Sequence, residues 1–96
     1  MKASVIITAL LPLASAWTLK VSTSDGRSVS SHGTKNSGCV NYDVGALKVN
    51  KAVFDDSLFA DTFELYTNRN CDKLNYRSGD GTHKMTARTV RSYKVY

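Results

Sequence analysis

Proline is almost absent from this chain of 96 residues, and the single one, Pro12, lies near the N-terminus. Because proline cannot donate a hydrogen bond to a neighbouring strand, no later strand is interrupted in this way. No Asn-x-Ser/Thr sequence occurs, so we expect no N-linked glycan. Only two cysteines occur, and neither has histidines at a zinc-ligand spacing. We therefore expect no metal site and no cofactor.

No hydrophobic run reaches the roughly 20 residues that a membrane-spanning helix requires. The longest run, residues 5–13, follows a lysine and precedes Ala-Ser-Ala at residues 14–16. A positive start, a short apolar stretch and a small-x-small end are typical of a secretory signal peptide. We expect residues 1–16 to be that signal and 17–96 to form one secreted, extracellular domain. A buried N-terminal helix is the alternative.

The scarcity of cysteine limits the possible cross-links to very few. In an oxidising compartment an even number of cysteines favours disulfides, and Cys39 and Cys71 allow one intramolecular pairing. Such a bridge would stabilise a small domain by about 2–4 kcal/mol. Two free thiols, or a disulfide between two chains, are the alternatives that remain open.

Acidic residues are fewer than basic ones, eight against 13, and none lies in the last fifteen residues. We interpret this segment as a weak surface-binding patch for an anionic cell surface, with an ordinary solvated strand face as the alternative. The cations of the proposed patch are Lys84, Arg88, Arg91 and Lys94. We expect no nucleic-acid partner and a monomeric protein.

What the sequence has in quantity is the period-two alternation of β-strands, as in Trp17, Leu19 and Val21. Asp-Gly within 24–26 predicts a tight turn. Residues 28–37 are interpreted as a loop or weak strand, and 51–62 as a linker with one helical turn. The remaining predicted strands are 38–43, 46–50, 63–67, 73–76, 82–87 and 90–96.

The two halves of the chain resemble each other at an offset of 46 residues. The units 17–50 and 63–96 align without gaps, so that Trp17 meets Phe63 and Leu19 meets Leu65. Because neither unit is large enough to bury its own apolar face, we expect two sheets packed over a shared core, with Glu64 facing outward. The predicted core is Trp17, Leu19, Val49, Phe63, Leu65, Tyr93 and Val95.

This repeat resembles the βγ-crystallin Greek-key family, most closely its small secreted members among killer-toxin-like and antifungal proteins and fungal effectors. The best match is the closing strand of residues 91–95, Arg-Ser-Tyr-Lys-Val. In the family's aromatic-x4-aromatic-x-Gly hairpin, Tyr66 fits the first position, whereas Cys71 and Lys73 replace the second aromatic residue and the glycine. The resemblance implies an all-β sandwich of two Greek-key units, here with one disulfide that joins the units.

The chemistry that the family or a catalytic site would need is not supported by the residues. At the family's calcium positions, Gly45 and Ala46 lack hydroxyls and Arg91 brings a cation. Asp55 and Asp56 are adjacent, so on a strand they would face opposite ways and not form a catalytic pair. His32 and His83 are interpreted as exposed loop residues. We therefore expect a protein that is not an enzyme.

The function predicted from these features is binding to an extracellular or host target. A fungal effector and an antifungal, killer-toxin-like protein fit the sequence about equally. A secreted protease inhibitor on the same scaffold, with an exposed loop at 28–37 or 78–81, is one alternative. A structural protein of a spore or wall is another.

Overall fold

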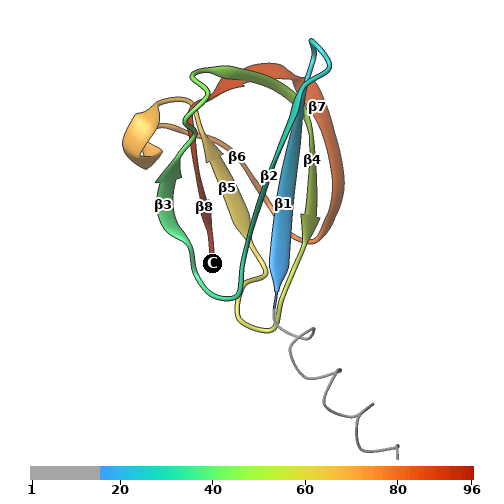
Figure 1. The fold of residues 1–96 in the computed structure, drawn as a ribbon, viewed down its shortest axis with the longest axis vertical. Coiled ribbons are helices and arrows are strands. Elements are labelled where there is room, and N and C mark those ends of the chain that lie inside the picture. Colours follow the sequence, from blue (N-terminus) through green and yellow to red (C-terminus); the bar gives the residue numbers. More distant parts are fainter. Residues whose placement is uncertain (1–15) are drawn as a thin grey trace, which may run out of the picture.

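The computed structural model describes residues 16–96, shown in Figure 1. All but the last residue of the predicted signal peptide therefore lies outside the described residues. The described chain is all-β, with eight strands and one short 3-10 turn, η2. The elements are β1 Trp17–Thr23, β2 Ser28–Gly33, β3 Gly38–Asn41, β4 Leu47–Asp55, β5 Phe63–Tyr66, η2 Arg69–Cys71, β6 Leu74–Ser78, β7 Gly81–Val90 and β8 Ser92–Val95.

The strands form two four-stranded sheets in which all neighbours are antiparallel. The first sheet has the order β2-β1-β4-β7 and the second the order β3-β8-β5-β6. Each sheet thus combines the first, second and fourth strands of one half with the third strand of the other half. The predicted all-β fold with two sheets is confirmed.

The core lies between the sheets and contains all seven residues predicted for it, each at most 6% exposed. Period-two alternation explains this, since every second side chain of β1 is turned inward and buried. Aromatic rings join the two sheets, with Phe54 of β4 at 5.3 Å from Phe63 of β5. The indole of Trp17 also donates a hydrogen bond to the carbonyl of Lys35, at 2.8 Å.

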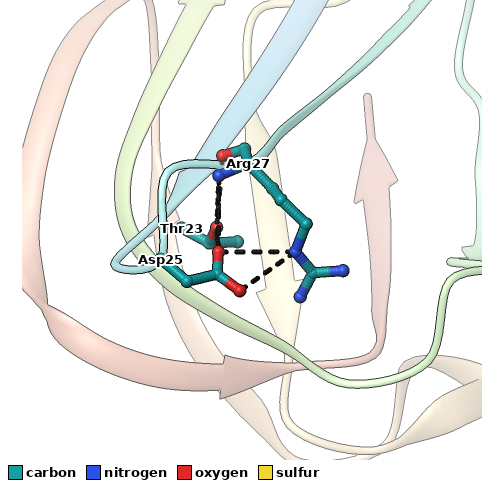
Figure 2. A network of polar contacts seen from close by, with 3 residues as sticks. All are labelled: Thr23, Asp25 and Arg27. Carbon is teal, nitrogen blue, oxygen red and sulfur yellow. Dashed lines mark hydrogen bonds and ion pairs between the residues drawn. The ribbon is translucent and has the colours of Figure 1, made fainter.

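The turn between β1 and β2 is held by the polar network in Figure 2. The Asp25 carboxylate accepts hydrogen bonds from the Thr23 hydroxyl and from the Arg27 side chain, the latter at 3.1 Å. The Thr23 hydroxyl bond, followed by Arg27, lowers the pKa of Asp25 below its usual value. Gly26 has a φ of 93°, a left-handed conformation that glycine adopts without a steric penalty. The turn predicted at 24–26 is confirmed.

A disulfide joins Cys39 and Cys71, with the Cα atoms 5.8 Å apart, and confirms the predicted pairing. It ties β3, at the edge of the second sheet, to the corner after β5. In this corner Asn70 has a φ of 62° and its amide donates to the Asn41 side chain at 2.7 Å. Ser92 is fully buried, and its hydroxyl accepts a bond from the Cys71 amide at 2.9 Å. Such a disulfide is compatible with an extracellular location.

The interpretation of residues 51–62 as a linker with a helical turn is wrong. Residues 51–55 complete β4, and a tight turn closed by Ser57 and Ala60 follows. The alternation of inward and outward side chains along β4 shifts by one residue at Asn50. Both neighbouring strands pair with Lys51 and with Val49 but leave Asn50 unpaired. This β-bulge breaks the alternation that sequence analysis detects. The segment 28–33 is the regular strand β2.

Two side chains lie in surroundings that the sequence did not predict. Glu64 faces the outer side of the second sheet, as expected, but it is only 6% exposed, because Tyr66 and Tyr96 cover it and donate hydrogen bonds to its carboxylate. His83 was expected in an exposed loop, but it lies on β7, half-buried, with its ring 5.4 Å from that of Phe63.

Candidate anion-binding face

The C-terminal cations do not gather in one patch, so that part of the prediction is wrong. Lys84 and Arg88 lie on β7 in the first sheet, whereas Lys94 lies on β8 in the second. Arg88 is placed over the ring of Tyr76, 5.6 Å from its centroid, and Arg91 donates to the carbonyl of Thr67 at 3.0 Å. The consecutive strands β7 and β8 belong to different sheets, which separates charges that are close in sequence.

Lysines from three strands instead share the outer face of the first sheet. Lys20 and Lys48 are each flanked by buried residues, so their side chains lie on the opposite, outer face. Lys51 precedes the buried Ala52, and its partner Lys84 lies between half-buried residues, which places this pair on the same face. We call this surface the lysine face. It consists of Lys20 on β1, Lys48 and Lys51 on β4, and Lys84 on β7. Of these, only Lys84 was among the residues predicted for surface binding.

Lys51 and Lys84 are direct cross-strand partners, and Ser22 is the partner of Lys51 on its other side. Directly opposed side chains on antiparallel strands have Cβ atoms about 4.5–5.5 Å apart, and like charges there destabilise the sheet by roughly 0.2–1 kcal/mol. The fold therefore places two lysine side chains directly opposite each other, which is expected to cost stability.

A shallow pocket of about 430 Å³ lies at this pair. The bulge at Asn50 opens it, since β7 places three residues opposite this single one between the paired positions. The pocket is lined by Ser22, Asn50, Lys51, Lys84 and Met85. Two cations, one hydroxyl and one amide thus line the same hollow, and all of these groups can donate hydrogen bonds.

The lysines of this face form no ion pair in the described residues. Within residues 16–96 the ion pairs are Asp25 with Arg27 and Glu64 with Arg77, neither of which involves this surface. One acid, Asp55, lies on the same face: it is four residues from Lys51 and thus about 13 Å along β4, beyond a Debye length of about 8 Å. It is a diagonal neighbour of Lys20, about 7–8 Å away, so it offsets part of the charge of Lys20 but not that of the pair formed by Lys51 and Lys84. Asp55 also accepts a hydrogen bond from Thr18 at 3.1 Å.

A second exposed feature is the turn that follows β4. Leu58 and Phe59 are 76% and 66% exposed, although large apolar side chains are usually buried. Ser57 and Ala60 close the turn with a backbone hydrogen bond of 2.9 Å, and Ala60 is buried. The two side chains are therefore presented on a well-held turn.

The outer side of the second sheet carries a buried carboxylate instead of a cationic face. Burial raises the pKa of Glu64, but hydrogen bonds from Tyr66, Tyr96 and Arg77 outweigh it, so the pKa is lowered overall. The Tyr96 hydroxyl donates at 2.6 Å. Burial and the nearby Glu64 in turn raise the pKa of Tyr66 to about 12. This cluster fixes the C-terminal residue to β5.

Neither a metal site nor a membrane helix is found in the part of the chain that the structure describes. There, no three His, Cys, Asp or Glu side chains are grouped so that they could hold a metal ion. Likewise, no helix within 16–96 has the length and hydrophobicity to cross a membrane.

Comparison with known proteins identifies no relative. No family model matches the chain, and neither does any curated protein or any solved structure. A proposal for the function therefore rests on the residues themselves.

The lysine face has a signal in the sequence, although the predicted surface-binding residues include only one of its lysines. Lysine stands between two apolar residues at Leu19-Lys20-Val21 and at Leu47-Lys48-Val49. On a strand this triplet predicts an outward lysine. Which strands share a sheet, and hence which lysines meet, depends on the exchange of β3 and β7 between the halves.

Proposed function

We propose that this chain is a small secreted, non-enzymatic protein that acts by binding, either as a fungal effector or as an antifungal, killer-toxin-like protein. Its contact with an anionic cell surface is the lysine face. The observation that carries the proposal is the direct pairing of Lys51 with Lys84 on a face whose lysines form no ion pair in the described residues.

A βγ-crystallin-like fold of two Greek-key units is part of the proposal. It is supported by the symmetric exchange of β3 and β7, which gives both sheets the same composition of strands. It is also supported at Lys73, which stands at the family's glycine position and has a φ of 69°. A left-handed conformation at that position is what a conserved glycine in a related hairpin would supply.

Binding through a lysine face follows from elementary electrostatics. An exposed cation near an anionic membrane contributes on the order of 1 kcal/mol, and the contribution falls within a Debye length. Three or four lysines on the same face of one sheet can approach a surface together, whereas cations on the outer faces of opposite sheets cannot. Lys20, Lys48 and Lys84 are exposed and Lys51 is half-buried.

The test is binding to vesicles of phosphatidylserine and phosphatidylcholine, compared with phosphatidylcholine alone. We expect wild type to prefer the anionic vesicles and K48Q/K51Q/K84Q to lose that preference. The matched control K35Q/R69Q/K73Q removes the same charge from exposed positions off the lysine face. If both triple variants lost this preference equally, net charge alone would explain the binding, and the proposal would be overturned.

A protease inhibitor is the second candidate, and the turn at Leu58 and Phe59 is the observation that favours it. The loops first considered do not suit an inhibitor, because 28–33 is strand β2 and 78–81 is a tight connection between β6 and β7. An exposed Phe on a held turn fits proteases that cleave after aromatic residues. Inhibition of chymotrypsin that is lost in F59A and kept in V44A, another exposed apolar residue, would support this candidate.

A further inference from the structure

We propose that the pocket at Lys51 and Lys84 is a specific site for a phosphate or sulfate ester, such as those on charged sugars or lipid headgroups. This inference deepens the proposed function and rests on it. The juxtaposition that carries it is a like-charge pair on adjacent strands beside a bulge that opens a hollow.

The position of the site follows from strand register and not from flexible side chains alone. Ser22, Lys51 and Lys84 form one row across β1, β4 and β7. Asn50 is the extra residue of β4 relative to β1, between the paired positions Val49 and Lys51, and its side chain lines the pocket. Residues of three strands with hydrogen-bond donors therefore line one hollow of the sheet.

The donor set selects the class of anion. The pocket offers hydrogen-bond donors from two ammonium groups, a hydroxyl and an amide. A single carboxylate has only two oxygens with which to accept from all of them. A tetrahedral phosphate or sulfate group presents at least three oxygens, and a phosphate monoester carries about −1.5 to −2 charge at pH 7. Lysine binds such groups as a point charge without a fixed direction.

The other charged groups around the pocket favour an anion. Lys20 and Lys48 lie on the same face. The turn at Asp25 approaches this end of β4 through a hydrogen bond from the Ser24 amide to the Lys48 carbonyl at 3.0 Å, but its carboxylate is paired with Arg27. The net field at the pocket is therefore positive.

The experiment is a titration of the wild-type protein, followed by amide NMR, with glucose 6-phosphate, glucose 6-sulfate and glycerophosphoserine as probes. Uncharged glucose is the blank. We expect saturable shifts confined to the amides around Ser22, Lys51 and Lys84. K51Q and K84Q should each raise the Kd of the preferred probe about tenfold, because the loss of one hydrogen bond to a charged group weakens binding by about that factor or more. K20Q, which removes a charge from the same face outside the pocket, should have a much smaller effect.

The probes distinguish the sources of the ester, and each supports the site if it binds. Preference for glucose 6-phosphate should grow between pH 5.5 and 7.5, as its second proton leaves near pH 6, whereas sulfate binding should stay constant. Preference for glycerophosphoserine would identify a lipid headgroup. Shifts without saturation, spread equally over all lysines, would overturn the pocket while leaving the binding of anionic vesicles intact. Loss of vesicle binding as well would refute the proposed function.

Discussion

Gly33 shows at the scale of one residue how closely the core is packed against the sheet. A Cβ atom there would lie 2.9 Å from the ring of Trp17, which is buried and held by its bond to Lys35. Because a rigid indole cannot move away as a flexible side chain could, the contact has to be relieved by the backbone. Trp17 thus makes glycine necessary at the end of β2.

We expect Gly33→Ala to lower the free energy of unfolding by about 1–3 kcal/mol, as overpacking usually does. Urea denaturation measures it, and Ser30→Ala, an exposed change on the same strand, should stay within about 0.5 kcal/mol of wild type. A Gly33→Ala protein as stable as wild type would show that the indole shifts freely.

Glu64 should make stability depend on acid. Its pKa in the folded protein is lowered, so it stabilises the fold fully above the unfolded value of about 4.3 and loses this contribution as pH falls through the folded value. We expect Glu64→Gln to cost about 1–3 kcal/mol at pH 7 and to flatten the decline of stability below pH 5. The measurement is urea denaturation from pH 7 to pH 3.

The control for this effect is Asp43→Asn, which changes an exposed carboxylate between β3 and β4. The free energy of unfolding of this variant should fall with decreasing pH as steeply as that of wild type. If Glu64→Gln and wild type lost stability in parallel between pH 5 and pH 3, the carboxylate would not be the group that responds to acid.

At the scale of elements, the strands with uninterrupted alternation could be predicted from the sequence and the interrupted ones could not. Strands β1 and β5 were recognised because their inward residues recur at every second position. The second half of β4 was missed because the bulge at Asn50 shifts that phase by one residue. The lysine face was missed because it depends on strand order, which no local pattern contains.

The disulfide is expected to matter most for β3. This strand is paired only with β8 in the second sheet, through four residues, and Cys39 links it to the corner at Cys71. Replacing both cysteines by serine should cost about 2–4 kcal/mol. Amide hydrogen exchange should accelerate in β3 more than in β1. Uniform acceleration of all strands would contradict a local role.

The repulsion between Lys51 on β4 and Lys84 on β7 should lower the free energy of unfolding by a measurable amount. Lys84→Glu places an acid opposite Lys51, so we expect the free energy of unfolding to rise by about 0.4–2 kcal/mol while binding to anionic vesicles falls. Chemical denaturation and vesicle sedimentation measure the two effects. A variant that binds as wild type does, or that is less stable, would contradict a functional pair.

At the scale of the whole molecule, the outer faces of the two sheets differ in charge. The first sheet carries the lysine face, and the second has Lys94 beside the buried carboxylate of Glu64. The apolar turn at Leu58 and Phe59 stands apart, next to Asp55, Asp56 and Asp61 in sequence. An anionic partner is therefore expected to meet the protein in one orientation, with the first sheet toward it.

Binding of anions by the lysine face is tested most directly by thermal unfolding of the protein with and without heparin, a soluble sulfated polyanion. A ligand that binds the folded state raises its melting temperature. We predict a rise for wild type and for K35Q/R69Q/K73Q, and little or no rise for K48Q/K51Q/K84Q. Equal rises in the two triple variants would contradict the central claim that the lysine face is the anion-binding surface.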